Sequence, residues 1–193
     1  MIFAGELIQL FKYSSKRQVL FEGIKGYDTP NIKPLCPTRW AVRTVALQTI
    51  LQNYPAICTT LNDIQRQSND EYARRAAGLL ALMEKFQTYF GLHLAVLVFS
   101  AAEQLSTTLQ GKQISAEDAS QAAAAYVRHL ARTRTEETFN EFYAKVVESS
   151  TDLTDPPVLP RRKKIPARFN DGADDHVYTE LSSFYRHQFF EVL

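Results

Sequence analysis

The stretch from residue 70 to residue 109 constrains the fold of this chain more than any other. Residues 92–109 are apolar on nearly all sides of a helical projection. A helix without a polar face has to be enclosed by other helices. The preceding residues place apolar side chains at helical spacings of three and four, namely Tyr72, Ala76, Leu79, Met83, Phe86 and Phe90. The stretch therefore predicts two core helices, separated at Gly91.

Several polar residues and one proline predict where helices begin and end. Asp70 is suited to cap the start of a helix, and Gly111 is suited to a left-handed cap after residue 109. Ser115 and Asp118 resemble a capping box, with Asp in place of the usual Glu or Gln. Pro55 should kink or restart the helix in which it lies, because it lacks an amide hydrogen.

The composition is that of a globular protein and excludes several classes. Of 193 residues, 45% are apolar and 22% charged, and the net charge of +1 gives no global basic field. The two cysteines form no CxxC pair, which argues against a disulfide framework or a cysteine-rich zinc site. The longest apolar run ends at Glu103, short of the roughly 20 residues that a bilayer needs. No membrane is therefore expected as a partner.

The pattern predicts an all-α fold, an irregular helical bundle. Residues 1–37 should hold short helices and a proline-rich connector, and residues 38–150 the bundle itself. Residues 151–176 read as a basic, proline-rich linker, and residues 177–193 as a C-terminal helix. Both ends of the chain lie on apolar helical faces without capping signals, so we expect a fragment of a longer chain.

No catalytic or cofactor-binding motif is present. The sequence lacks GxGxxG, a Walker lysine loop, HExxH and GxSxG. The four histidines are scattered, and His93 lies in the apolar stretch, where a core histidine is the simpler interpretation. We therefore expect no enzyme, no cofactor and no metal.

Positive charge is concentrated locally. Residues 1–53 carry seven Lys or Arg and three Asp or Glu, a net charge of +4, which fits a solvated face or a surface for a phosphate backbone. A second cluster lies among prolines and fits a nuclear import signal, a solvated linker or a loop that contacts nucleic acid; it consists of Arg161, Arg162, Lys163 and Lys164.

The string Cys36-Pro37-Thr38-Arg39-Trp40 is the most distinctive one, and it holds the only tryptophan. A tryptophan at the start of a helix usually packs that helix against its neighbour. Beside Arg39 it also suits a stacking platform for an unpaired or flipped base. Both interpretations stay open.

The surrounding sequence is similar to a known family. Residues 35–43, LCPTRWAVR, resemble the C-x-TRW-x-x-R segment of hAT-superfamily transposases, in particular of the zinc finger MYM-type and repressor-of-the-inhibitor-of-protein-kinase-like proteins derived from them. Further stretches resemble the same group, in the same order along nearly the whole chain: residues 11–17, 83–86, 90–92, 99–106, 109–112, 159–162 and 185–191.

The resemblance implies the α-helical insertion that interrupts the RNase H-like core of an hAT transposase. In that family two aspartates and a glutamate hold divalent metals for DNA strand transfer, and no residue here matches them. The family's Arg-Trp pair, matched by Arg39 and Trp40, is implicated in handling DNA at the cleaved transposon end. The resemblance therefore implies a catalytically inactive part of a domesticated transposase, and the residues we expect to contact DNA are Arg39, Trp40, Lys12, Lys16, Arg17 and Arg43.

The alternative expectation is a helical protein-interaction scaffold that binds no nucleic acid. The family also implies protein partners or self-association. Nuclear localisation follows from the family together with residues 161–164, and a cytoplasmic protein is expected otherwise. Exposure of Trp40 beside the basic residues favours DNA contact, whereas burial of Trp40, with Arg39 paired to a carboxylate, favours the scaffold.

Overall fold

The structure is a computed structural model that describes residues 2–34, 43–111, 114–160 and 178–193. These residues form helices and no strands, so the predicted all-α class is confirmed for the part described. The helices are α1 (Ile2–Lys12), α2 (Ser15–Ile24), α3 (Arg43–Gln52), α4 (Tyr54–Gln67), α5 (Glu71–Met83), α6 (Phe86–Leu109), α7 (Ala116–Thr133), α8 (Glu136–Ser149) and α9 (Leu181–Val192).

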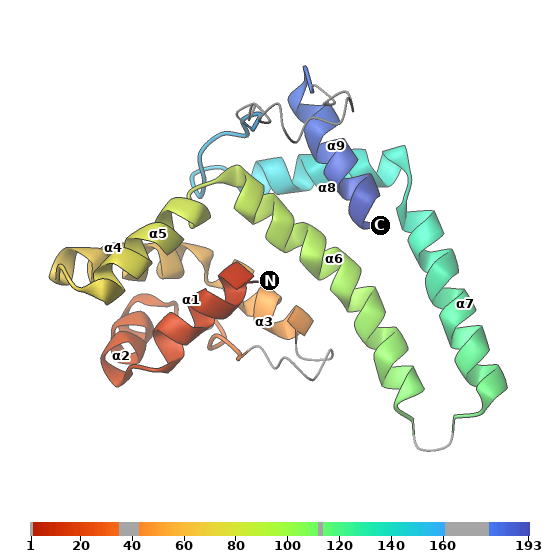
Figure 1. The fold of residues 1–193 in the computed structure, drawn as a ribbon, viewed down its shortest axis with the longest axis horizontal. Coiled ribbons are helices and arrows are strands. Elements are labelled where there is room, and N and C mark those ends of the chain that lie inside the picture. The colour runs from red at the N-terminus through yellow and green to blue at the C-terminus, as the bar shows by residue number, and fades with distance from the viewer. Residues whose placement is uncertain (1, 35–42, 112–113, 161–177) are drawn as a thin grey trace, which may run out of the picture.

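One long helix joins two differently built regions. Helices α1 to α5 pack together at the end of the molecule that is red to yellow in Figure 1, and α6 starts beside them. From there α6 crosses the molecule, and α7 returns beside it as the second arm of a helical hairpin. Helices α8 and α9 contact each other and lie across the top of the view.

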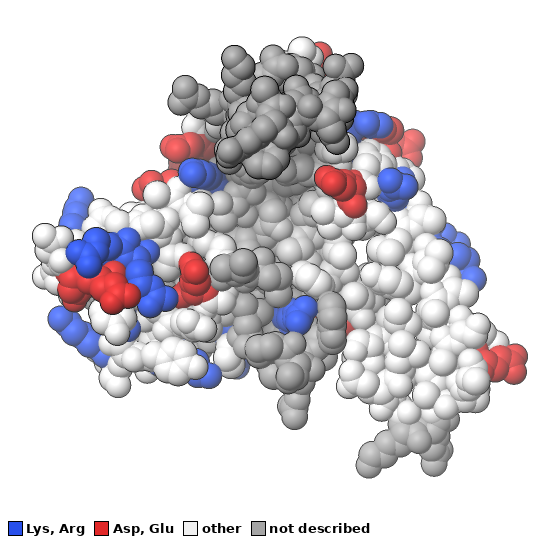
Figure 2. Space-filling model, viewed as in Figure 1, with Lys and Arg blue, Asp and Glu red and all other residues white. Residues whose placement is uncertain are grey.

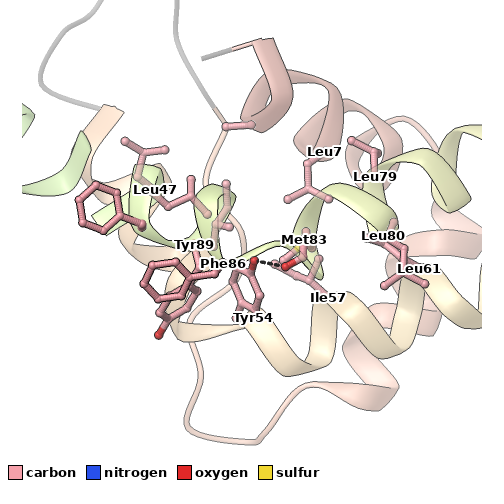
Figure 3. Close-up of a cluster of buried hydrophobic side chains, with 14 of the residues drawn as sticks. Leu7, Leu47, Tyr54, Ile57, Leu61, Leu79, Leu80, Met83, Phe86 and Tyr89 are labelled. Carbon is pink, nitrogen blue, oxygen red and sulfur yellow. Dashed lines mark hydrogen bonds between the residues drawn. The ribbon is translucent and has the colours of Figure 1, made fainter. Parts of the chain in front are cut away.

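The main core lies where α1, α3, α4 and α5 meet the beginning of α6. Tyr54 stands at its centre, and its hydroxyl donates a hydrogen bond of 2.6 Å to the carbonyl oxygen of Met83 (Figure 3). Leucines and isoleucines from four helices surround this pair. Burial of this apolar surface is the main source of stability for the fold.

A second, aromatic part of the core attaches α8 and α9 to the start of α6. Phe90 is fully buried, and its ring centroid lies 4.8 Å from that of Tyr185 and 5.5 Å from that of Phe142. Phe139 of α8 lies 5.5 Å from Phe189 of α9, measured between ring centroids. These aromatic contacts join residues that are about 50 to 95 positions apart in the chain.

The capping signals predicted at helix starts by Asp70 and by Ser115 with Asp118 are confirmed. Asp70 accepts a hydrogen bond of 2.8 Å from the backbone N–H of Ala73 at the start of α5. Ser115 and Asp118 form the expected capping box at the start of α7. Pro55 lies in the first turn of α4, directly after the end of α3, so the helix restarts at the predicted position.

Gly91 does not separate two helices, and that prediction is wrong. Helix α6 runs through Gly91 without interruption, and the break lies instead between Met83 and Phe86. A glycine inside a helix costs only about 1 kcal/mol relative to alanine, which is less than burial of one large apolar side chain contributes. Gly111 likewise does not adopt the left-handed conformation that we predicted.

The second part of α6 is less enclosed than its composition predicts. From residue 95 to residue 109 no side chain of α6 is buried, and α7 buries none either. Among the described helices α6 is the one whose length and composition suffice to cross a membrane, a criterion that core helices also meet. Tyr72, expected on the inner face of α5, is 46% exposed.

Candidate nucleic-acid interface

The predicted DNA-contacting residues fall into two sets. Arg39 and Trp40 lie outside the described residues, as does the basic cluster of residues 161–164. The structure therefore places four of the predicted residues: Lys12, Lys16, Arg17 and Arg43.

Lys12 and Lys16 flank the turn between α1 and α2, and both are exposed. Neither ammonium group forms a hydrogen bond or an ion pair with another described residue. Both charges are accordingly available to a phosphate group or to another anion.

The side chain of Arg17 already makes contacts within the fold. Its Nε donates a hydrogen bond of 2.6 Å to the carbonyl oxygen of Leu10, and its guanidinium carbon lies 4.3 Å from the ring centroid of Tyr72. These contacts tie α2 to α1 and to the first turn of α5. The helical spacing of Tyr72 predicted an inner position and does not explain its exposure. Its ring instead forms this cation–π contact.

The start of α3 is fixed by a carboxylate from α6. The backbone N–H of Thr44 donates a hydrogen bond of 2.8 Å to Oε1 of Glu103. The N–H groups of a first helical turn lack partners within the helix, and a negative charge there is favoured by the helix dipole. Arg43 precedes Thr44, is half-buried and takes part in an interaction of its own.

Sequence analysis did not assign a role to Glu103. It is the only charged residue of α6, and a single carboxylate in an otherwise uncharged helix indicates a specific partner. That signal was present in the sequence, but the partner lies 59 positions away and belongs to a different helix.

The chain before residue 35 is also held in place. The side-chain amide of Asn53 donates a hydrogen bond of 2.8 Å to the carbonyl oxygen of Pro30. The backbone N–H of Lys33 donates a hydrogen bond of 3.3 Å to Oγ1 of Thr49. Together with the bond from Thr44 to Glu103, these contacts fix the chain on both sides of residues 35–42. In the sequence, Arg39 and Trp40 come between these two fixed parts of the chain.

The four described basic residues do not form one cluster. Arg17 lies against Tyr72 at the start of α5, whereas Arg43 is next to the bond between α3 and α6. In Figure 1, α2 lies at the opposite end of α1 from the place where α3 meets α6. Figure 2 shows Lys and Arg interspersed with Asp and Glu over the end of the molecule near α2.

Acidic groups at this end lower the local positive potential. The pKa of Asp70 is lowered mainly by the hydrogen bond that its carboxylate accepts from the backbone N–H of Ala73. The positive charge of Arg17 lowers it further. Asp70 is consequently an anion at neutral pH, next to the stacked pair of Arg17 and Tyr72. The arrangement favours isolated phosphate contacts at Lys12 and Lys16 over a continuous basic surface.

No metal-binding group is found among the described residues, since no three His, Cys, Asp or Glu side chains gather there. His93 is half-buried beside Tyr89, and burial lowers its pKa. Its Nε2 is buried without a hydrogen-bond partner in the described part of the chain.

Comparison with known proteins adds no assignment. No protein-family model matches the chain, and no solved structure matches it.

Proposed function

We propose that this chain is the helical, non-catalytic part of a protein derived from an hAT-type transposase, and that it contacts DNA through Arg39 and Trp40. The resemblance of residues 35–43 to the family's C-x-TRW-x-x-R segment supports this, and an all-α fold is compatible with the family's helical insertion. No residue matches the family's metal-binding carboxylates, so the proposed activity is binding without strand cleavage.

The observation that carries the proposal is the fixation of the chain on both sides of Arg39 and Trp40. Thr44 is bonded to Glu103, and Pro30 is bonded to Asn53. A segment with fixed ends loses less conformational entropy on binding than a free chain of the same length. The segment is therefore suited to present a ring and a guanidinium group to a ligand.

Different residues supply different parts of the proposed contact. The indole of Trp40 stacks on an unpaired base, and Arg39 beside it pairs with phosphate or adds a cation–π contribution. Lys12 and Lys16 supply further phosphate contacts, since their charges have no partner in the described residues. Arg17 contributes mainly through the fold, because its Nε and its ring contact are already used.

The single tryptophan makes the test direct. Intrinsic tryptophan fluorescence reports on Trp40 alone, since the chain holds no other. Titration with single-stranded DNA and with a DNA hairpin should quench this emission, and the affinity should fall with rising salt. Trp40→Ala should weaken binding, followed by the anisotropy of labelled DNA, about 5- to 150-fold, the usual loss for one stacked base.

Two controls separate stacking from general charge. Trp40→Phe should retain most of the affinity, because a phenyl ring still stacks. Arg128→Ala removes one positive charge from α7, a helix that holds none of the residues proposed to contact DNA, and should leave the affinity close to that of the unmodified chain. Absence of binding at low salt, or equal losses in Arg39→Ala and Arg128→Ala, would contradict the proposal.

A second candidate function is a helical protein-interaction scaffold. Two observations favour it: the apolar side chains of α6 beyond residue 94 are half-exposed, and Val127 of α7 is 63% exposed. Sedimentation equilibrium across a concentration series tests self-association, and Val127→Glu should abolish it. A monomer at all concentrations, together with salt-sensitive DNA binding, would favour the first function.

Nuclear localisation belongs to the same proposal. It rests on the family resemblance and on the basic cluster of residues 161–164. Replacement of all four basic residues by alanine in a fluorescent fusion should move the protein to the cytoplasm; unchanged nuclear accumulation would remove the role of the cluster.

A further inference from the structure

A cavity lies between α1, α2 and the chain after α2. Its volume is about 510 Å³, within the roughly 300–1,000 Å³ typical of small-molecule sites. Most of its wall is apolar and comes from three parts of the chain: Ile8, Phe11, Val19, Phe21, Ile32 and Pro34. Such a wall suits an alkyl chain or an aromatic ring.

Two acceptors at this cavity, in Glu22 and Asn31, are already engaged. The carboxylate of Glu22 forms an ion pair of 3.0 Å with Nζ of Lys25. The same Nζ donates a hydrogen bond to Oδ1 of Asn31. Lys25 therefore neutralises the one negative charge that lines the cavity.

The positive charge at the rim, by contrast, is uncompensated. Lys12 lines the cavity, and its ammonium group has no ion pair or hydrogen bond within the described part of the chain. The amide nitrogen of Asn31 has no acceptor there either. An apolar interior bordered by an unpaired cation is complementary to a ligand with an apolar body and an anionic end.

We propose that this cavity binds an amphipathic carboxylate, a medium-chain fatty acid in its simplest form. The alkyl chain occupies the space between Phe11, Val19 and Ile32, and the carboxylate meets the ammonium of Lys12. The apolar wall disfavours a nucleotide, whose sugar and phosphate would lose hydration without hydrogen-bond partners. Lys12 is shared with the proposed DNA contact, but fatty-acid binding in the cavity does not require DNA binding and is tested separately.

Isothermal titration calorimetry with octanoate, decanoate and dodecanoate below their micellar concentrations tests the apolar part. Each added methylene group should tighten binding roughly fourfold, the equivalent of its transfer from water. Absence of saturable binding, or an affinity that does not change with chain length, would overturn the proposal.

The carboxylate part is tested with Lys12→Met, which keeps the length of the side chain and removes its charge. The variant should bind decanoate at least fivefold more weakly and decanol as well as the unmodified chain does. Lys16→Met removes the same charge four residues away, at a position that does not line the cavity, and should change neither affinity. Equal losses in Lys12→Met and Lys16→Met would overturn the role of Lys12.

A further pair of variants distinguishes the cavity from other apolar surfaces. Val19 lines the cavity and is 71% exposed, so Val19→Asp should block binding without unfolding the chain. Val127 is similarly exposed but lies on α7. If Val127→Asp weakens decanoate binding as much as Val19→Asp does, the ligand binds elsewhere and the proposal is wrong.

Discussion

The two halves of α6 have similar composition and opposite environments. In the inner half, residues 86–94, five side chains are buried: Phe86, Tyr89, Phe90, Leu92 and Leu94. In the outer half, residues 95–109, none is buried, although this half also holds valines, leucines and a phenylalanine. The difference shows that apolar composition indicates only that a helix favours burial. How far its side chains are buried depends on the number of helices that pack against it.

The neighbours of the two halves explain the difference. The inner half meets α5 and α8 and lies in the aromatic core with α9. The outer half is covered by α3 and α7, and α7 presents small alanines toward it, including Ala122 and Ala125. Two helices cannot enclose a third, so part of the outer half faces outward. Apolar surface of this kind often marks an interaction site.

The largest expected effect is in the inner half. Phe90→Ala should lower the free energy of unfolding by about 3–5 kcal/mol, since Phe90 is fully buried among Phe142, Tyr143 and Tyr185. Guanidinium unfolding monitored by circular dichroism measures this. A loss under 1 kcal/mol would mean that α8 and α9 do not pack on α6 as described.

A matched pair of leucines compares the two halves at constant chemistry. Leu92 is 6% exposed and Leu105 is half-exposed. Leu92→Ala should cost about 2–4 kcal/mol and Leu105→Ala about 1 kcal/mol, since the latter removes side-chain atoms already in contact with water. The same unfolding experiment applies to both. Equal costs would imply that the outer half is enclosed after all.

Glu103 should be the exception within the outer half. Glu103→Ala removes the acceptor for the N–H of Thr44 and should cost about 1–3 kcal/mol. Glu103→Gln keeps an acceptor oxygen and should restore part of this loss. Amide exchange at Thr44 measured by NMR should accelerate in Glu103→Ala, and an unchanged rate would show that the carboxylate does not hold α3.

Gly91→Ala tests the continuity of α6 where its two halves are nearly joined. A Cβ placed at Gly91 meets no atom within 4 Å, and the residue is exposed. Alanine should therefore stabilise the chain by about 0.5–1 kcal/mol. If Gly91 instead separated two helices in a left-handed turn, the same substitution would destabilise the chain.

The smallest effect concerns the cap of α7 and depends on pH. The hydrogen bond from the side chain of Ser115 lowers the pKa of Asp118, with a further contribution from the Ser115 backbone N–H. A lowered pKa means that the ionised carboxylate stabilises the cap. Its contribution is present above the unfolded pKa of about 3.9 and is lost as the pH falls through the folded pKa.

NMR amide shifts of α7 should therefore change in acid, and Asp118→Asn should remove this dependence. The inner half of α6 should stay unaffected over the same pH range. Simultaneous changes in both regions would indicate that α7 does not open separately from the core.

Local signals predicted the helix ends, because capping depends on residues three or four positions apart. Asp70 and Ser115 each accept a hydrogen bond from a backbone N–H three positions later, as expected. The prediction at Gly91 was wrong because it considered only the low helix propensity of glycine, a cost of about 1 kcal/mol. Burial of the apolar side chains on either side of Gly91 outweighs that cost. The exposure of the outer half of α6 was not predicted, because hydrophobic periodicity carries no information on how many helices pack against a given helix.

The candidate site was less predictable because its contacts are distant in sequence. The contacts of Arg17 with Tyr72 and of Thr44 with Glu103 join residues 55 and 59 positions apart. Positive charge in residues 1–53 drew attention to Lys12, Lys16 and Arg17 alike, and no local pattern indicates that Arg17 is used within the fold. A count of charged residues gives the net charge of a region. Whether each charge is available to a ligand depends on how its side chain packs.

Hydrogen exchange followed by mass spectrometry along α6 tests the central comparison most directly. Peptides from the inner half should exchange slowly, near the rate set by global unfolding, because their amides open only when the core does. Peptides from the outer half and from α7 should exchange at least tenfold faster, through local opening of the helical hairpin. Equally slow exchange along all of α6 would contradict the account and would mean that something encloses the outer half in solution.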